Sequence, residues 1–520
     1  MKLNYKRTLF VGFAFFLITV FWQAYDNIIP KILTDKFGLS QFWSGIIMAL
    51  DNVLAVFLLP VFGALSDRCR GKHGRRTPFI LVGTIVAAIL FVGLSFADQL
   101  QLNSISDISA VTSEEASEER SDALLALYRA DITWEQSSGS VGGGASKTSL
   151  AQIYGSEDAF LAAMNSPDAD LTHLTHARQL YAWQATCENP VVLAVFVFLL
   201  LCVLLAMSTF RSPAVALMPD VTPKPLRSRA NAVINLMGTA GGILVLVLGI
   251  VFGTGKPGNT LMSYTVFFMV VSLIMLIALL IFCLRVRETQ WAAEADRFND
   301  TVDGAEEAVS VSHRSLTRAE LCSLCFLLAS VALWYMGYNA VTSKYSVYAG
   351  DVLLLDYNLT LIVAQAAAIV SYIPVGIVAS KIGRKKTILA GVIILGAAFG
   401  AASFMGAGSN LWVMNGLFAL AGIGWATINV NSYPMVVEMA QSGDVGRYTG
   451  YYYTASMSAQ IVTPILSGAF LTYVGMRTLF PYAAIFVGLA FVTMLFVRHG
   501  DSLPGKRDSL LEQLGADGDD

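Results

Sequence analysis

Long runs of apolar residues recur along the whole chain, separated by short polar stretches. A helix needs about 20 mostly apolar residues to cross the hydrocarbon core of a bilayer. Runs of that length predict twelve spanning helices, at about 8–30, 42–65, 77–97, 190–218, 230–252, 261–285, 317–341, 357–380, 387–406, 410–437, 449–474 and 478–498. The sequence therefore predicts an all-α integral membrane protein.

Basic residues gather in alternate loops between these helices. The rich loops hold Arg68, Arg70, Lys72, Arg75 and Arg76; Lys224, Arg227 and Arg229; and Lys381, Arg384, Lys385 and Lys386. Two of the opposite loops hold only Lys256 and only Arg477. Loops rich in Lys and Arg remain in the cytoplasm. We therefore expect a multi-pass protein of the cell membrane with both termini in the cytoplasm.

Two longer polar stretches divide the chain. We expect a first six-helix bundle at 1–285 that contains an external polar insertion at 98–189, a cytoplasmic linker at 286–316, a second six-helix bundle at 317–498 and a cytoplasmic tail at 499–520. The insertion is acidic and includes a flexible SSGSVGGGAS stretch. A solvated external cap with a few short helices is its simplest interpretation; a glycan-capturing or partner-binding part is the alternative.

Composition limits the possible functions. Of the 520 residues, 55% are hydrophobic and only 14% are charged, whereas soluble domains carry about 25% charged residues. The net charge of −3 gives no sign of nucleic-acid binding. The six scattered cysteines form no disulfide framework, and Cys322 and Cys325 lack the second pair that a zinc site needs. We expect no metal and no cofactor.

The stretch GALSDRCRGKHGRRTPFI, from Gly63 to Ile80, resembles the loop signature of the major facilitator superfamily. Its wider form is similar to that of the sucrose/proton symporters and their animal relatives, which belong with the glycoside–pentoside–hexuronide:cation symporters. The resemblance implies two pseudo-symmetric six-helix bundles that alternate access to a central site. It also implies a gating motif, which here comprises Gly63, Asp67, Arg68, Gly74, Arg75, Arg76, Arg211, Asp220, Gly383 and Arg384.

Two features depart from that family pattern. The fourth-helix motif of the sucrose carriers has an arginine after its proline, whereas here Val215 occupies that position and Arg211 precedes Pro213. The second-half copy of the loop motif has Ser380 where the first half has Asp67. The charge cluster around Asp67 can hold the two halves together on one side; the alternative is a set of charges that only fixes topology.

Two carboxylates lie inside predicted spanning helices. Asp26 and Asp51 each precede an asparagine, and neither has a Lys or Arg one helical turn away. An ionisable residue in a spanning helix costs about 2.5–3.5 kcal/mol on insertion scales, so it is a functional candidate by default. We expect one of them, Asp51 in preference, to carry a coupling proton. The alternative is a pair of interfacial acids in contact with external water.

Sugar binding needs flat aromatic faces beside hydrogen-bonding groups. Residues of both kinds lie in the predicted helices, several at i, i+3 or i+4 spacing: Trp22, Gln23, Asn27, Asn52, Asn235, Trp334, Tyr335, Tyr338, Asn339, Trp425, Asn429, Asn431 and Gln460. We expect these to be candidates for substrate contact. The alternative is that the aromatic rings anchor the helices at the interface and the amides bond helix to helix.

The combined pattern favours a secondary active transporter. A disaccharide or other small glycoside, such as sucrose or maltose, carried with a proton is what the resemblance implies; sodium is the alternative ion. We expect a monomer in the lipid bilayer. An exporter of drugs or metabolites and a non-transporting sugar sensor remain alternatives. An enzyme is not expected, because neither an HExxH nor a GxSxG motif occurs.

Overall fold

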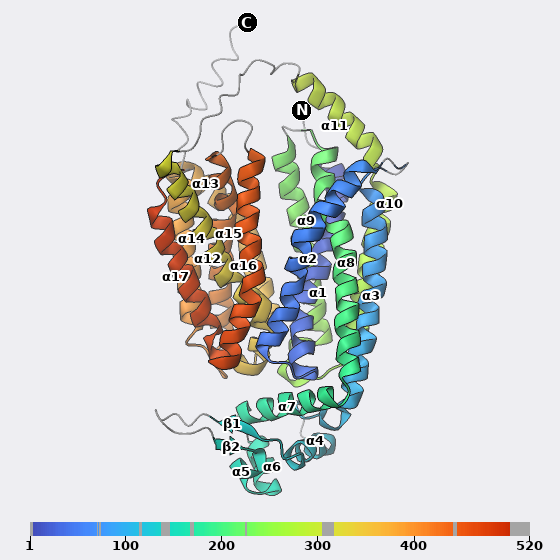
Figure 1. The fold of residues 1–520 in the computed structure, drawn as a ribbon, viewed down its shortest axis with the longest axis vertical. Coiled ribbons are helices and arrows are strands. Elements are labelled where there is room, and N and C mark those ends of the chain that lie inside the picture. The colour runs from blue at the N-terminus through green and yellow to red at the C-terminus, as the bar shows by residue number, and fades with distance from the viewer. Residues whose placement is uncertain are drawn as a thin grey trace.

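A computed structural model of the chain describes residues 4–69, 71, 74–113, 117–136, 146–166, 171–223, 226–303, 317–439 and 445–499. Twelve long helices form two bundles (Figure 1). The first bundle contains α1 (Tyr5–Lys31), α2 (Gln41–Arg68), α3 (Thr77–Ser104), α8 (Pro190–Val221), α9 (Arg227–Phe252) and α10 (Thr265–Arg285). The second contains α12 (Arg318–Tyr348), α13 (Tyr357–Ile382), α14 (Arg384–Ala402), α15 (Leu411–Glu438), α16 (Val445–Tyr473) and α17 (Leu479–Phe496).

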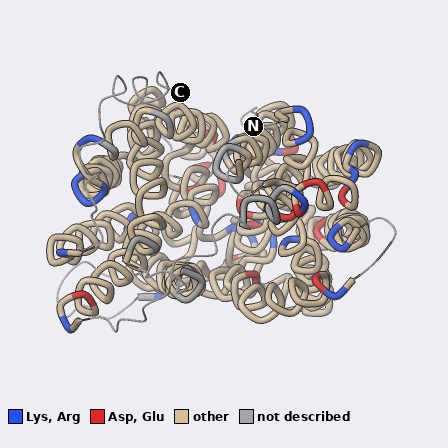
Figure 2. The backbone as a smooth tube through the Cα atoms, turned by 90° about the horizontal axis from the view of Figure 1, so that it is seen from above, with Lys and Arg blue, Asp and Glu red and all other residues tan. Residues whose placement is uncertain are grey.

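The predicted all-α membrane fold is confirmed. Among the described residues, eleven of these helices are long and apolar enough to span a bilayer, and α13 contributes a shorter apolar stretch, Tyr357–Tyr372. Each bundle has its own hydrophobic core. Viewed along the helices, the two groups lie side by side, and most of the tube is uncharged (Figure 2). Apolar side chains therefore face both the core and the surrounding lipid, as a spanning bundle requires.

The third helix is longer than its apolar run. We expected it to end at 97, but α3 continues to Ser104, so the insertion begins after that residue and not at Asp98. Asp98 is fully buried and accepts two bonds from Lys36 Nζ, at 2.7 and 2.8 Å. Gln101 Nε2 donates to the Lys36 carbonyl at 2.9 Å. Because these polar groups are paired inside the protein, the helix can continue past the point where its sequence becomes polar.

The first helix of each bundle ends in the same way. A π-helical turn, η1 (Ile32–Lys36), continues α1, and another, η5 (Ala349–Leu353), continues α12. Each turn carries one aspartate, Asp35 or Asp351. The two halves thus share both their helix order and this aspartate-bearing π turn. Such π turns are often found at functional sites.

The insertion folds over one end of the bundles. Its elements are η2 (Ser106–Ile108), α4 (Glu118–Arg129), β1 (Trp134–Gln136), β2 (Ser146–Thr148), α5 (Leu150–Tyr154), α6 (Glu157–Met164) and α7 (Thr172–Glu188). The strands pair antiparallel, with Trp134 opposite Thr148. This segment, residues 105–189, has its own hydrophobic core and is named the cap; α7 lies against the membrane helices, and the end it covers is the cap end (Figure 1).

The opposite end holds the chain ends of the bundles and the linker. Helix α1 begins there, and α11 (Glu288–Asp303) follows α10 across it (Figure 1). This end is named the linker end. Short 3-10 turns complete the loops at the cap end, η4 (Pro257–Asn259) and η6 (Met476–Thr478).

Candidate functional site

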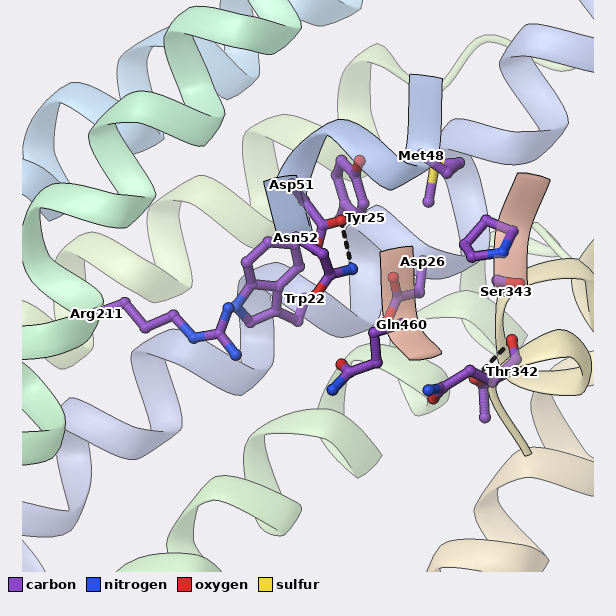
Figure 3. A pocket seen from close by; sticks show the side chains of 12 residues that line it. Trp22, Tyr25, Asp26, Met48, Asp51, Asn52, Arg211, Thr342, Ser343 and Gln460 are labelled. Carbon is purple, nitrogen blue, oxygen red and sulfur yellow. Dashed lines mark hydrogen bonds between the residues drawn. The ribbon is translucent and has the colours of Figure 1, made fainter. Parts of the chain in front are cut away.

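A polar cavity of about 170 Å³ lies between the two halves (Figure 3). Its walls come from α1, α2 and α8 of the first half and from α12 and α16 of the second. The lining residues are Trp22, Tyr25, Asp26, Met48, Asp51, Asn52, Arg211, Asn339, Thr342, Ser343, Gln460 and Pro464. A central site formed by both bundles is the usual location for cargo in carriers built from repeats.

Two carboxylates and one guanidinium share this cavity. Arg211 of α8 interacts electrostatically with Asp26 of α1 and with Asp51 of α2. Asn52 Nδ2 donates to Asp51 Oδ1 at 2.7 Å. Neither acid has a cation one turn away on its own helix, and α8 supplies one from a distant part of the chain. Arg211, which we had grouped with the gating motif, lies in the cavity (Figure 3).

The cavity also presents a flat aromatic surface and donors without partners. The Arg211 guanidinium lies 5.2 Å from the centroid of the Trp22 ring. Trp22 Nε1, Tyr25 Oη and Asn339 Nδ2 are buried and have no hydrogen-bond partner among the described residues. A buried donor without a partner costs about 1–3 kcal/mol. Water or a bound polar molecule would satisfy these groups, so the arrangement suits a hydroxylated ligand.

Seven of the predicted site residues meet in this cavity: Trp22, Asp26, Asp51, Asn52, Arg211, Asn339 and Gln460. Tyr25, which flanks the predicted polar face of the first helix, also lines the cavity, whereas Met48, Thr342, Ser343 and Pro464 were not predicted. Helical spacing could have indicated most of these lining residues. Thr342 and Ser343 follow Asn339 by three and four positions, and Met48 precedes Asp51 by three, so each shares a helix face with a residue that was selected.

Three predicted amides bond helix to helix or to their own helix. Gln23 Oε1 accepts from Gln365 Nε2 of the second half at 2.7 Å. Asn27 Nδ2 donates to the Gln23 carbonyl at 2.8 Å, and Asn431 Nδ2 donates to the Thr427 carbonyl at 2.9 Å. None of the three lines the cavity. These three amides therefore follow the alternative interpretation, in which amide side chains form hydrogen bonds within or between helices and do not face the cargo.

The predicted aromatic residues of the second half form a separate cluster. Tyr338 stacks on Trp425, with ring centroids 3.8 Å apart, and Tyr335 meets the same ring edge-on at 5.1 Å. Asn429 bonds to the side chain of Tyr372. Trp334 is fully buried in the core, and Asn235 is exposed on α9. These residues lie outside the lining of the cavity.

The gating motif forms a charge cluster at the linker end. Arg75 and Arg76 both bind Asp220, with Nη2–Oδ1 at 2.9 Å and Nε–Oδ2 at 2.8 Å respectively. Arg76 also contacts Asp67, and it bonds to the Gly63 carbonyl at 3.4 Å. Arg75 and Arg76 lie in the loop before α3, and their partners belong to α2 and α8. We expected the cluster to join the two halves, but its described bonds join helices within the first half.

The linker helix completes this cluster. Glu288, the first residue of α11, accepts bonds from the backbone N–H groups of Arg75, Arg76 and Thr77, at 2.7, 2.8 and 2.8 Å. It thereby caps the start of α3, where a negative charge is favoured. Gly74 allows this close approach, since its φ is 103° and a Cβ there would overlap the Glu288 carboxylate.

The remaining motif residues lie at the equivalent helix ends. Gly383, with φ of 94°, turns α13 into α14, which Arg384 begins. Arg68 is exposed at the end of α2. The two loops therefore share their turn geometry, whereas the described carboxylate contacts belong to the first-half loop.

A second charge cluster, which the sequence did not suggest, lies at the cap end. Arg178 of α7 is almost fully buried, and its Nη2 lies 3.1 Å from Asp35 Oδ1 and 3.5 Å from Asp351 Oδ1. The cap arginine thus contacts the π turns of both halves. Lys31 interacts electrostatically with both of these aspartates. Nothing in the sequence indicated this cluster, because Arg178, Asp35 and Asp351 lie in segments that are far apart along the chain.

The halves also contact each other directly at this end. Buried Lys344 of α12 donates to the Gln41 carbonyl of α2 at 3.0 Å. The hydroxyls of Thr254 and Tyr357 lie 3.0 Å apart across the interface. Among the described residues, the hydrogen bonds between the halves extend from the Gln23–Gln365 pair to the cap end. The structure is therefore closed on the cap side of the cavity.

No metal centre is formed within the described ranges, because no group of three or more His, Cys, Asp or Glu side chains is close enough together to hold an ion. Cys322 and Cys325 are exposed on α12.

Comparison with known proteins identifies the family. The Major Facilitator Superfamily model matches residues 180–373 and 354–514, and the MFS/sugar transport protein model matches residues 10–106. The inward-open structure of the xylose transporter XylE from E. coli superposes over 99% of both chains, with a TM-score of 0.54 and 14% identity. A likeness at that identity shows a shared fold alone.

Curated relatives match over short segments. The "Putative glycoside/cation symporter YagG" of Escherichia coli is 38% identical over 71 residues, which is 14% of this chain and 15% of the relative. The "Sucrose transport protein SUC4" of Arabidopsis thaliana is 35% identical over 55 residues, 11% of each chain. The matched segments thus cover much less than two thirds of either relative.

Proposed function

We propose that this chain, which belongs to the Major Facilitator Superfamily, is a secondary active transporter that carries a small glycoside together with a proton. The observation that carries the proposal is the central cavity, which combines two carboxylates, one arginine, an aromatic face and unpaired donors. Carriers built from two repeated bundles place their substrate site between the bundles.

The proposed cargo follows from the lining chemistry. Trp22 and Tyr25 offer ring surface for the C–H faces of a sugar, while Asn339 and Gln460 offer amides for its hydroxyls. The sugar-transport model and the names of the two curated relatives support this cargo class.

The proposed coupling follows from the charge balance. Asp26, Asp51 and Arg211 together carry one net negative charge when both acids are ionised. A net charge inside a membrane protein is costly, and one proton on either carboxylate removes it. Binding of one proton therefore makes the site neutral. Release of that proton after the halves move would couple the proton gradient to cargo movement. A related symporter in the same fold, the D-xylose-proton symporter, superposes with a TM-score of 0.53.

Alternating access then requires the cap end to open. We infer that the linker end faces the cytoplasm, because the basic loops lie at that end, and that the cap faces outward. Opening outward must separate Arg178 from Asp351 and Lys344 from Gln41. The charge cluster on the first-half loop moves as part of one rigid half during this step.

Uptake in proteoliposomes tests this function. The purified chain is supplied with labelled mono- and disaccharides, with and without a pH gradient, and with sodium present or absent. We expect glycoside accumulation that depends on the pH gradient and not on sodium. Asp26→Asn and Asp51→Asn should each be assayed, and at least one should lose accumulation while still exchanging sugar. Exposed Asp158 of the cap provides the control, Asp158→Asn, which should behave like the unaltered chain.

Two outcomes would contradict the proposal. Full proton-driven accumulation in both aspartate variants would remove the coupling role of the cavity. Binding of sugar without any flux would favour a sensor, and outward pumping of unrelated hydrophobic compounds would favour an exporter.

A further inference from the structure

A second cavity, of about 280 Å³, lies at the linker end on the outer side of the first bundle. Its walls come from the start of α1, the end of α10 and the start of α11. Four of its eight lining residues are basic, and none is acidic: Lys6, Arg7, Arg285 and Arg287. The transport cycle described above uses none of them.

Two nearby acids are already paired, and one of them neutralises a basic residue of the cavity. Glu294 of α11 binds Arg7 at 2.5 Å, and Glu288 is buried against the start of α3. Lys6, Arg285 and Arg287 remain exposed, with no carboxylate partner within the described part of the chain. The cavity therefore has a surplus of positive charge, which favours an anionic ligand.

The cavity lies where lipid headgroups are expected. The exposed side of α10 is apolar up to its last turn: Leu280 is 58% exposed and Leu284 is 72% exposed. On α1, Leu9 is 42% exposed, close to the basic residues at the start of that helix. These side chains face acyl chains, so the basic residues that follow them lie at headgroup depth.

Aromatic rings hold the cationic side chains in place. The Arg285 guanidinium lies 5.7 Å from the Phe10 ring centroid, and that of Arg7 lies 5.3 Å from the Trp291 ring centroid. Trp291 is almost buried in the core of the first bundle, so α11 is fixed beside the cavity. Two of the four basic groups are thus restrained beside the cavity before any ligand binds.

We propose that this cavity binds the phosphate-bearing headgroup of an anionic phospholipid, and that the bound lipid holds α11 against the first bundle. Basic cavities between helices on the cytoplasmic side of a membrane commonly bind such headgroups. The lipid would bridge Arg285 of α10, Arg287 at the start of the linker and Lys6 of α1. It would thereby strengthen the contact through which Glu288 caps α3.

Native mass spectrometry and thermal unfolding test this proposal. The chain is prepared in nanodiscs of phosphatidylcholine alone and with added phosphatidylglycerol or a phosphoinositide. We expect selective retention of the anionic lipid and a higher unfolding temperature. Each basic residue near an anionic surface contributes roughly fivefold in affinity, so the double variant Arg285→Gln, Arg287→Gln should weaken retention about 25-fold. The variant should unfold normally in neutral lipid.

A matched control and a soluble probe distinguish the possible sources of phosphate. Lys381 and Lys386 are exposed basic residues on the second bundle, outside the cavity, and Lys381→Gln with Lys386→Gln should retain lipid normally. Glycerol phosphate is tested in neutral nanodiscs. Equal loss in both double variants, or equal retention of neutral and anionic lipid, would overturn the proposal. Protection by glycerol phosphate without lipid retention would also overturn it.

Discussion

The contact between Arg178 and Asp351 gives a sharp test of how the cap end opens. Arg178 of the cap binds both Asp35 of the first half and Asp351 of the second. Asp351→Asn removes the charge from the second half and keeps the size of the side chain. Arg178 keeps its nearer partner, Asp35, whereas buried Lys31 loses one of the carboxylates with which it interacts. The expected effect is an easier separation of the cap from the second half.

The magnitude follows from the geometry. Two opposite charges 3.5 Å apart attract by about 5 kcal/mol at an effective dielectric of about 20. Lys31 adds to this attraction, whereas burial of the Asp351 charge and repulsion from Asp35 offset most of it. The hydrogen bond from Gln179, at 3.4 Å, can persist with asparagine. A net loss of about 1–2 kcal/mol remains, so the population open at the cap end should rise about 5- to 30-fold.

Thiol labelling measures this population. Thr342→Cys places a single thiol on the cavity wall in a background whose native cysteines are replaced by serine. A membrane-impermeant maleimide added from the cap side then labels only molecules that have opened. Glu157→Gln is the matched control, because Glu157 forms an exposed pair with Arg129 inside the cap. An unchanged rate in Asp351→Asn, or an equal rise in the control, would show that this contact does not hold the cap end closed.

Three further changes test other contacts by thermal unfolding or by the same labelling assay. Glu288→Gln weakens the cap on α3 and should cost about 1–2 kcal/mol of stability. Gly74→Ala should lower the unfolding temperature more than Gly155→Ala, because both glycines have positive φ but only Gly74 faces a carboxylate. Gly45→Val should raise the labelling rate, because a side chain there would overlap the Pro464 carbonyl of the opposite half.

Controls separate these effects from general damage. Glu294→Gln changes an exposed acid of the same linker helix and should cost less than the change at Glu288. Gly93→Val enlarges a helical glycine that has open space around it and should leave the labelling rate unchanged. Equal effects in the paired variants would contradict the assigned contacts.

The helices and the candidate acids could be predicted from the sequence alone. A bilayer leaves backbone groups no solvent partners, so each long apolar run must become a helix, and its length shows in the sequence. The same cost made Asp26 and Asp51 recognisable as functional candidates, and the structure places both in the cavity. Spacing on one helix also linked Asn339 to the central face.

Tertiary structure decided which of these groups meet. Whether Arg211 neutralises Asp26 and Asp51, or takes part in the loop cluster, depends on how α8 is rotated against α1 and α2. The contact of Arg178 with Asp35 and Asp351 joins positions more than 140 residues apart in each case. Asp98 is tolerated in the extended α3 only because Lys36 lies beside it. The sequence shows which charged residues lie in apolar helices, where burial of a charge is unfavourable. Only the packing of the helices determines which opposite charge lies beside each of them.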